Sequence, residues 1–227
     1  NGVNAGHFRV YVWDGAIWVK RGIDLDGEGA GDLSWKASLS ENGSVLAIGS
    51  NLNDGNGVDA GHVRVYEWFD SGWKMRGSDI DGAAADHWTG HSVSLSGDGS
   101  LIAVGSPQAG RVEGGYLGSV QVYAFNGSNY VPRGSDILGE APGDNSGGAI
   151  SLSSDGSVLA IGAIINDGNG NAAGHVRLYS QRDGSWVQVG SDIDGEAPGD
   201  NSGISVSLSS DGSVVAIGAW RNGAYDS

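Results

Sequence analysis

A fourfold internal repeat is the feature of this sequence that most constrains its fold. The segment at 6–11, Gly-His-Phe-Arg-Val-Tyr, returns in related form at Gly61, Gly118 and Gly174, at spacings of 55, 57 and 56 residues. Four such copies account for the 227 residues of the chain. We therefore predict a single domain over 1–227, built from four repeats of about 57 residues each.

Each repeat contains four short runs of β-branched or aromatic residues bounded by Gly, Asp, Asn or Ser, which is the signature of β-strands. In order they are A (Ser-Leu-Ser), B (Val-Leu-Ala-Ile-Gly), C (Gly-His-Val-Arg-Val-Tyr) and D (an aromatic residue with Gly four positions later). The A runs begin at Ser38, Ser94, Ser151 and Ser207, and the B runs at Val45, Leu101, Val158 and Val214. An Asn-Gly or Asp-Gly pair separates A from B in every repeat, which predicts a tight hairpin.

Strand B is apolar on both faces, so its sheet must be covered on both sides. Four-stranded antiparallel sheets packed face to face around an axis meet this need, and the predicted fold is an all-β β-propeller of four blades. The sequence begins just before a C strand and ends just after a B strand. A first blade made of 1–31 plus 204–227 would close the ring by pairing the N-terminal and C-terminal strands. Alternatively, the four repeats are part of a larger propeller.

Composition excludes several classes of protein. The chain has no Cys, so it forms no disulfide, thiolate metal site or cysteine nucleophile. A formal net charge of −15 argues against nucleic-acid or anionic-membrane partners and favours cations. No apolar run approaches the ~20 residues of a membrane span, and the first ten residues lack the regions of a signal peptide. We expect a soluble domain.

The acidic residues are concentrated in the D-to-A and B-to-C loops, which alternation of the strands places on one face; these loops hold 19 of the 27 acids. Carboxylates two residues apart followed by Gly suit a hard cation such as calcium. The candidate calcium ligands are Asp24, Asp26, Glu28, Asp32, Asp79, Asp81, Asp192, Asp194, Glu196 and Asp200 in the D-to-A loops and Asp54, Asn56 and Asp59 in a B-to-C loop. The alternative is that these residues form turns and accept backbone hydrogen bonds.

A specific site is expected where the repeat symmetry breaks. At the start of strand A the equivalent positions are Trp35, His91, Gly148 and Ile204. The candidate ligand-binding residues near this point are Trp35, Trp88, His87, His91, Trp220 and Arg221. The alternative is that the tryptophans fill gaps between loops. A zinc site at His87 and His91 is not favoured, because a spacing of four serves a helix and this segment enters a strand.

Other recurring residues are expected to be structural. His7, His62 and His175 recur on strand C beside Arg9, Arg64 and Arg177, which predicts a hydrogen-bonded ladder, and the strand D tryptophans are predicted to pack between blades. The sequons at Asn42 and Asn126 fit either N-glycosylation or ordinary Asn-Gly turns.

Several of these motifs together resemble FG-GAP repeats. They are Ser-Gly before strand A (Ser146-Gly147, Ser202-Gly203), Val104-Gly105-Ser106-Pro107 after strand B, and Gly-x-Val-x-Val-Tyr in strand C. FG-GAP repeats form the propeller blades of integrin α-chain heads and of many secreted proteins, so the resemblance implies a propeller in an extracellular, adhesive setting. The Phe of the family's Phe-Gly is absent, and a tight turn replaces the family's calcium loop between A and B, so that calcium site is not carried over.

Three functions remain open from the sequence. The first is a secreted or cell-surface adhesion module that binds carbohydrate or protein through the acidic face, assisted by calcium. The second is a propeller hydrolase with a calcium-dependent acidic site, although no nucleophile with its base and no phosphate loop is recognisable. The third is an architectural unit that self-associates within a larger surface assembly.

Overall fold

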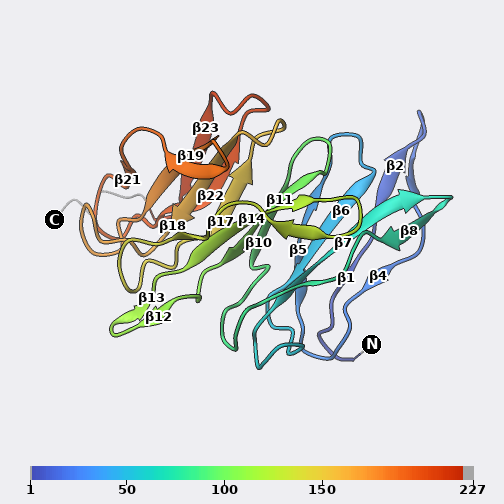
Figure 1. The fold of residues 1–227 in the computed structure, drawn as a ribbon, viewed down its shortest axis with the longest axis horizontal. Coiled ribbons are helices and arrows are strands. Elements are labelled where there is room, and N and C mark those ends of the chain that lie inside the picture. The colour runs from blue at the N-terminus through green and yellow to red at the C-terminus, as the bar shows by residue number, and fades with distance from the viewer. Residues whose placement is uncertain (1, 222–227) are drawn as a thin grey trace.

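The computed structural model describes residues 2–221, which form β-strands joined by turns (Figure 1). The predicted all-β class is confirmed for these residues. Within the same range, no helix is long and apolar enough to cross a membrane.

Three complete antiparallel sheets have the same strand order. Sheet 1 contains β5 (Ser34–Leu39), β6 (Val45–Ser50), β7 (His62–Phe69), β8 (Gly72–Met75) and β9 (Ile80–Asp81). Sheet 2 contains β10 (Ser92–Leu95), β11 (Leu101–Ser106), β14 (Ser119–Phe125), β15 (Tyr130–Pro132) and β16 (Ile137–Leu138). Sheet 3 contains β17 (Ala149–Leu152), β18 (Val158–Ala163), β19 (His175–Arg182), β20 (Ser185–Gln188) and β21 (Ile193–Asp194). The predicted order A-B-C-D is thus present in all three sheets.

The fourth strand of each sheet is interrupted, which the sequence pattern did not predict. In sheet 1, both β8 and β9 pair with β7, and between them Gly77 has a φ of 91°. Gly134 and Gly190 occupy the same place in sheets 2 and 3, also with positive φ. This left-handed backbone conformation favours glycine, so the Gly after the aromatic residue bends the strand and directs its last part into the next loop.

Two half-sheets flank the three complete sheets. The N-terminal half-sheet pairs β1 (His7–Phe8) with β4 (Leu25–Asp26) and β2 (Tyr11–Trp13) with β3 (Trp18–Lys20). The C-terminal half-sheet pairs β22 (Ser202–Leu208) with β23 (Val215–Ala219). They correspond to strands C and D and to strands A and B of the predicted first blade.

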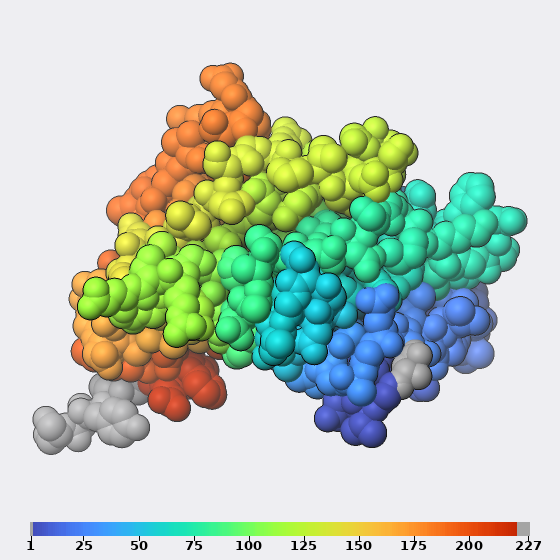
Figure 2. Space-filling model, turned by 60° about the horizontal axis from the view of Figure 1, so that its bottom comes forward, coloured from blue at the N-terminus to red at the C-terminus, as the bar shows by residue number. Residues whose placement is uncertain are grey.

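The structure does not confirm the predicted closure of a four-bladed ring. Among the described strands, neither half-sheet pairs with the other. The sheets form an open arc that leaves the half-sheets at opposite ends, as the ribbon and the space-filling view both show (Figures 1 and 2). Positions 1 and 222–227 of the predicted first blade lie outside the described residues.

The core lies between successive sheets. Every residue of β6 and of β11 is buried, which confirms that strand B is covered on both faces. Val45 and Val65 of sheet 1 belong to one apolar cluster with Ile102 and Tyr130 of sheet 2, and a similar cluster joins sheets 2 and 3. Sheet 2 is therefore stabilised by burial against both of its neighbours.

The Ser-Leu-Ser run of strand A also links the sheets. Ser38 Oγ accepts a hydrogen bond from the backbone N–H of Leu95, the equivalent Leu of the next sheet, at 2.9 Å. The same bond recurs between Ser94 and Leu152 at 2.9 Å. A serine hydroxyl in strand A thus joins each sheet to the next strand A, which explains why the run recurs.

The predicted A-to-B hairpins are confirmed. In the sheet 1 hairpin, Asn42 Oδ1 accepts hydrogen bonds from the Ser44 backbone N–H and the Ser40 hydroxyl. Asp98, Asp155 and Asp211 make the corresponding bonds in the later hairpins. One sheet also carries an addition that was not predicted: the B-to-C loop of sheet 2 forms a small hairpin of β12 (Arg111–Val112) and β13 (Gly115–Tyr116).

A candidate binding pocket between sheets 1 and 2

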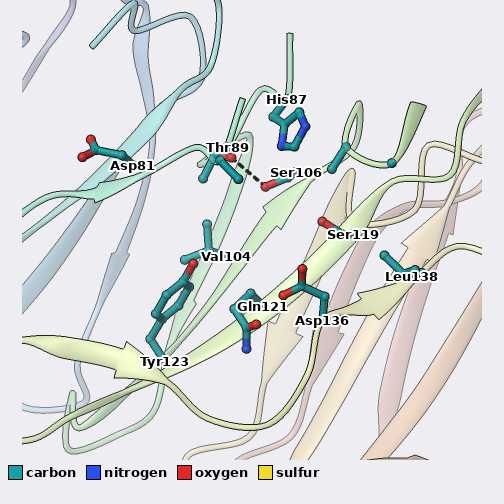
Figure 3. Close-up of a pocket in the computed structure, with 13 residues that line it drawn as sticks. Asp81, His87, Thr89, Val104, Ser106, Ser119, Gln121, Tyr123, Asp136 and Leu138 are labelled. Carbon is teal, nitrogen blue, oxygen red and sulfur yellow. Dashed lines mark hydrogen bonds between the residues drawn. The ribbon is translucent and has the colours of Figure 1, made fainter. Parts of the chain in front are cut away.

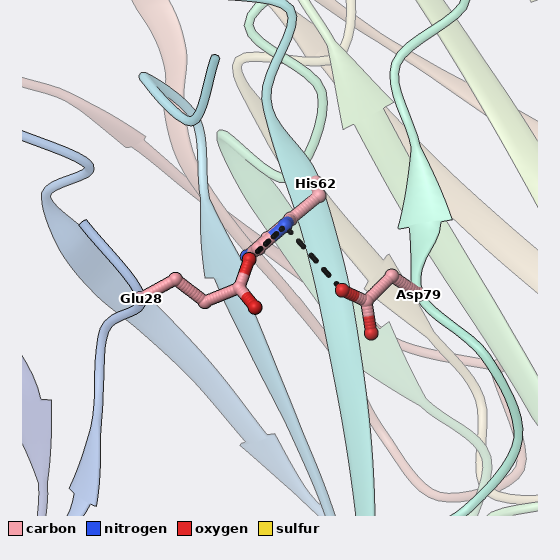
Figure 4. Close-up of side chains that lie close together, drawn as sticks. All are labelled: Glu28, His62 and Asp79. Carbon is pink, nitrogen blue, oxygen red and sulfur yellow. Dashed lines mark ion pairs between the residues drawn. The ribbon is translucent and has the colours of Figure 1, made fainter. Parts of the chain in front are cut away.

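A repeated ion-pair network occupies the junction between the loop that precedes a sheet and strand C of that sheet. Each junction takes the number of its sheet. At junction 1, Arg64 on β7 pairs with Glu28 from the preceding loop and with Asp79, whose Oδ2 lies 3.3 Å from its Nε. His62 Nδ1 lies 3.8 Å from a carboxylate oxygen of each of these two acids (Figure 4). A guanidinium thus lies among the carboxylates that surround His62.

Junction 3 has the same composition. Arg177 Nη1 lies 3.3 Å from Glu140 Oε1, and His175 Nδ1 lies 3.5 Å from Asp192 Oδ2. His175 is almost completely buried, and burial lowers its pKa below the ordinary value, as it does for His62. These two networks agree with the predicted structural role of the recurring His and Arg, although the arginines form ion pairs with acids of the preceding loop and the histidines lie beside acids of their own sheet.

Junction 2, between sheets 1 and 2, lacks this network. The junction 1 residues Glu28, Asn53, His62 and Arg64 have as their counterparts Ala83, Ala109, Ser119 and Gln121. Each counterpart is smaller and uncharged. One acid is retained, because Asp136 corresponds to Asp79.

A cavity of about 210 Å³ lies where these smaller side chains leave space. Its lining residues are Asp81, Ala83, His87, Thr89, Val104, Ser106, Ala109, Gly110, Ser119, Gln121, Tyr123, Asp136 and Leu138. Figure 3 shows Ser119, Gln121 and Tyr123 along β14, Asp136 just before β16, and His87 on the loop opposite. The pocket is therefore the same junction without its internal arginine.

The polar groups of the pocket are partly without protein partners. Ser119 is 7% exposed, and no hydrogen bond of its hydroxyl is found among the described residues. Asp136 likewise forms no ion pair within 2–221. Gln121 donates its Nε2 to the Val122 carbonyl at 2.9 Å, so its Oε1 remains as an acceptor. The pocket presents mainly hydrogen-bond acceptors.

The charge of Asp136 affects its neighbours. Burial raises the pKa of Tyr123 to about 12, and Asp136 adds to this rise. Burial lowers the pKa of His87, against the opposing effect of Asp136 and Asp86, so His87 is neutral at pH 7. No lining residue is therefore positively charged at that pH, and the potential in the pocket is negative.

The pocket wall is otherwise built like the other junctions. The hydroxyls of Thr89 and Ser106 are hydrogen-bonded at 2.9 Å, as those of Ser34 and Ser50 are at 2.7 Å in junction 1. This hydroxyl pair of the scaffold is thus kept at junction 2.

The loop that precedes sheet 2 differs from its counterparts at His87, which takes the position of Asp32, Asp144 and Asp200. In junction 1, Asp32 Oδ2 accepts hydrogen bonds from the Gly29 N–H at 2.9 Å and from Asn53 Nδ2 at 3.0 Å. These buried aspartates hold their loops in shape, which is the turn-forming role considered for the acids. His87 makes no such bond in the described part of the chain and lines the pocket instead.

The other candidate calcium ligands are dispersed. Asp24 pairs with Arg9 and Lys20, Asp54 accepts the Asp59 N–H, and Asn56 donates to the Gly82 carbonyl. Asp26, Asp81 and Asp194 lie on β4, β9 and β21, each opposite the recurring His of strand C. Asp194, Glu196 and Asp200 line a separate hollow near β23. Calcium binding by these loops stays a prediction.

The candidate ligand-binding residues fall into two groups. The Trp35 and His91 rings lie 4.9 Å apart, His91 stacks on Trp88 at 6.1 Å, and Lys36 lies over Trp35. Burial, and then Lys36, lower the pKa of His91 to about 4. The loop that carries Trp88 and His91 also carries His87 into the pocket.

The second group lies at the far end of β23. Trp220 donates its Nε1 to Asn201 Oδ1 at 3.0 Å, and the Arg221 guanidinium lies 4.8 Å from the Trp220 ring centre. Nothing in the described structure joins this pair to Trp35 or Trp88. The six residues therefore do not form one site.

The sequence analysis missed Ser119, Gln121, Tyr123 and Asp136. The signal was present in strand C, where Ser119 and Gln121 depart from the His and Arg of the other three repeats. Only their position at a junction between sheets shows that this departure leaves a cavity.

Comparison with known proteins identifies the type of fold but no family. No family model matches the chain, and no curated protein matches it. The chain resembles a putative 6-phosphogluconolactonase from Bacteroides uniformis with a TM-score of 0.55 and 14% identity, over 94% of this chain and 52% of that chain. It resembles one from Bacteroides fragilis with a TM-score of 0.52 and 10% identity, over 84% of this chain and 43% of that chain. It also resembles Kuenenia stuttgartiensis hydrazine synthase with a TM-score of 0.50 and 15% identity, over 80% of this chain and 40% of that chain.

These similarities support a β-propeller-type fold and no more, because identity is low. The chain spans about half the length of the proteins it resembles, or less. The resemblance to FG-GAP repeats stays a prediction.

Proposed function

We propose that this protein is a propeller-type binding module, and that the pocket at junction 2 holds the guanidinium or ammonium group of its ligand. The observation that carries the proposal is the loss of an internal cation with retention of one of the two acids at its junction. Arg64 and Arg177 each supply a guanidinium to junctions 1 and 3. Junction 2 keeps Asp136 and has Gln121 in the place of the arginine. A cationic group from outside restores the pairing.

The chemistry of the lining favours an organic cation over an anion. Asp81 and Asp136 are both acidic, His87 is neutral at pH 7, and Gln121 Oε1 accepts hydrogen bonds. A phosphorylated sugar, as named for the putative 6-phosphogluconolactonases, would meet two carboxylates and no basic lining residue. Fold similarity at 14% identity does not outweigh that mismatch.

The lining also favours an organic cation over calcium. Calcium takes six to eight oxygen ligands, and the pocket supplies two carboxylates from different elements. Val104, Leu138 and the Tyr123 ring add apolar surface that suits the methylene stem of an arginine or lysine side chain. A partner protein that presents such a side chain fits the predicted adhesive role.

A hydrolase is less favoured at this pocket. Thr89 and Ser106 hydrogen-bond to each other, and neither they nor Ser119 hydrogen-bond to His87 within the described structure. A nucleophile requires a base within hydrogen-bond reach.

The proposal is tested by titrating the protein with N-acetyl-arginine amide, N-acetyl-lysine amide and the neutral N-acetyl-norleucine amide in a calorimeter. Two charge-assisted hydrogen bonds are worth about 3–6 kcal/mol, which corresponds to a dissociation constant between several millimolar and tens of micromolar. Binding of a cationic probe without binding of the norleucine probe is expected.

Two variants with the same net charge locate the site. Asp136→Asn should weaken binding about tenfold or more, whereas Asp183→Asn, in the exposed turn between β19 and β20, should not change it. Equal effects of the two variants would mean that only overall charge attracts the probe. Binding of calcium alone, with no effect of the cationic probes on it, would replace the proposal by a metal site.

A further inference from the structure

Two departures from the repeat meet at the interface between sheets 1 and 2, in the interior of the chain. One is the pocket of junction 2, which lacks the internal arginine. The other is the group of three rings formed by Trp35, Trp88 and His91, here called the ring cluster. The corresponding positions between sheets 2 and 3 are His91, Asn145 and Gly148, so the cluster is specific to the first of these interfaces.

The pocket and the ring cluster lie at the same end of sheet 2. Ser106 on β11 pairs with Ser119 on β14, and both line the pocket. Gly105, the neighbour of Ser106, pairs with Ser92, which follows His91 in the chain. His91 therefore continues the row of Ser106 and Ser119 on to strand A. Adjacent strands lie about 4.8 Å apart, so the ring cluster begins about 5–10 Å from the pocket. One short segment of a ligand can reach both.

The backbone of Trp88 adopts a conformation that does not favour tryptophan. Its φ is 54°, in the left-handed region, which is uncommon for a bulky residue. The counterparts Asn145 and Asn201 have φ values of 53° and 54°, and asparagine is enriched in this region. Leu33, at the same position of the first repeat, has a φ of 47°. Strained residues of this kind cluster at binding sites, so the ring of Trp88 is a candidate for contact with a ligand.

The two ends of this surface differ in charge. The pocket has the carboxylates of Asp81 and Asp136, whereas Lys36 Nζ lies 4.7 Å from the centre of the Trp35 ring. Lys36 would repel a second cation at the ring cluster and would not repel an uncharged side chain. Trp35 is 50% exposed, and tryptophan contributes strongly to protein interfaces. The ring cluster therefore suits a large apolar side chain.

We infer that the ligand is an extended segment of a partner protein, with an arginine or lysine in the pocket and a large apolar side chain two residues away on the ring cluster. In an extended segment, side chains two residues apart point to the same side and lie about 6.6–6.8 Å apart. That spacing matches the separation of the two features. The inference rests on the proposed function and adds the sequence pattern of the partner.

Three acetylated and amidated peptides test this pattern by calorimetric titration. They are Leu-Ser-Arg-Ser-Leu, Ser-Ser-Arg-Ser-Ser and Leu-Ser-norleucine-Ser-Leu. Leucine on both sides of the central residue makes the test independent of the direction in which the peptide lies. The native protein should bind the first peptide about tenfold more tightly than the second, because one leucine is buried on the rings, and should not bind the third.

Variants of the ring cluster locate the leucine. Trp88→Asn introduces the residue type of its counterparts, which this backbone conformation favours, so the variant should keep its Tm. In it the tenfold ratio between the two arginine peptides should fall below about twofold. Trp35→Ala should have the same effect. Trp18→Asn, at a position that is 66% exposed on β3, is the matched control and should keep the full ratio.

The outcomes separate this inference from the proposed function. If the norleucine peptide binds as tightly as Leu-Ser-Arg-Ser-Leu, the cation pocket is wrong and the inference is overturned with it. If the two arginine peptides bind the native protein equally, the pocket stands and the inference alone is overturned. A tenfold ratio that persists in both Trp88→Asn and Trp35→Ala would also overturn it, because the leucine would then contact another surface.

Discussion

Converting junction 2 into a copy of junction 1 should abolish cation binding without loss of stability. The triple substitution Ala83→Glu, Ser119→His and Gln121→Arg places the junction 1 residue types at their counterpart positions. The new guanidinium would lie beside Asp136 as Arg64 lies beside Asp79, at 3.3 Å. The internal cation would then compete with any external one.

The size of the pocket allows this change. The three substitutions add about ten side-chain heavy atoms, which occupy roughly 200 Å³ at protein packing density. The cavity measures about 210 Å³, so the added atoms fill it without overpacking. The new ion pairs are partly exposed and are worth about 0–1 kcal/mol each. For a chain of this size 1 kcal/mol corresponds to about 2–4 °C in Tm, so we expect Tm to be unchanged or raised by a few degrees.

The assay is titration with N-acetyl-arginine amide together with thermal unfolding of the same preparations. The triple variant should bind the probe at least tenfold more weakly than the native protein, with Tm retained. A variant that keeps its Tm and still binds the probe with native affinity would refute the reasoning, because the guanidinium would then not occupy the ligand position. A fall in Tm of more than about 5 °C would refute the volume argument.

Three further predictions follow from the contacts. Trp73→Phe removes the hydrogen bond from Trp73 Nε1 to a backbone carbonyl of the N-terminal half-sheet, so it should cost about 1 kcal/mol of unfolding free energy in a urea titration; Trp18→Phe, at the exposed counterpart, should not lower it. Burial lowers the pKa of His91 to about 4, so as pH falls His91 is protonated in the unfolded chain at a higher pH than in the folded protein. The free energy of unfolding should therefore decline from pH 6.5 toward pH 4, by up to about 3 kcal/mol, and His91→Gln should make this decline less steep. Calcium binding is tested by Tm in chelator and in excess calcium, where a site saturated at 100 times its Kd adds about 2.7 kcal/mol; Arg64→Gln should enlarge the shift, since it removes the guanidinium beside the junction 1 carboxylates, and an equal shift in both proteins would place calcium elsewhere.

The sequence determined the strands and their order because every repeat contains the same short motifs, and each motif specifies a local element. The Asn-Gly and Asp-Gly turns, the apolar runs of strand B and the Ser-Leu-Ser runs each specify a short element through its own residues, and four copies confirm one another. Burial of β6 and β11 on both faces followed directly from their composition. The bend in strand D at Gly77 could not be predicted from the sequence, because a single Gly does not show where strand pairing begins again.

The tertiary structure alone decided the site and the shape of the whole. Glu28 comes from the repeat that precedes the one containing His62 and Arg64, and only the stacking of successive sheets makes them one network. For the same reason, the replacements at Ser119 and Gln121 become a pocket only where sheets 1 and 2 meet. Ring closure depends on the angle between successive sheets. That angle is a property of side-chain packing at each interface, and no short sequence motif encodes it.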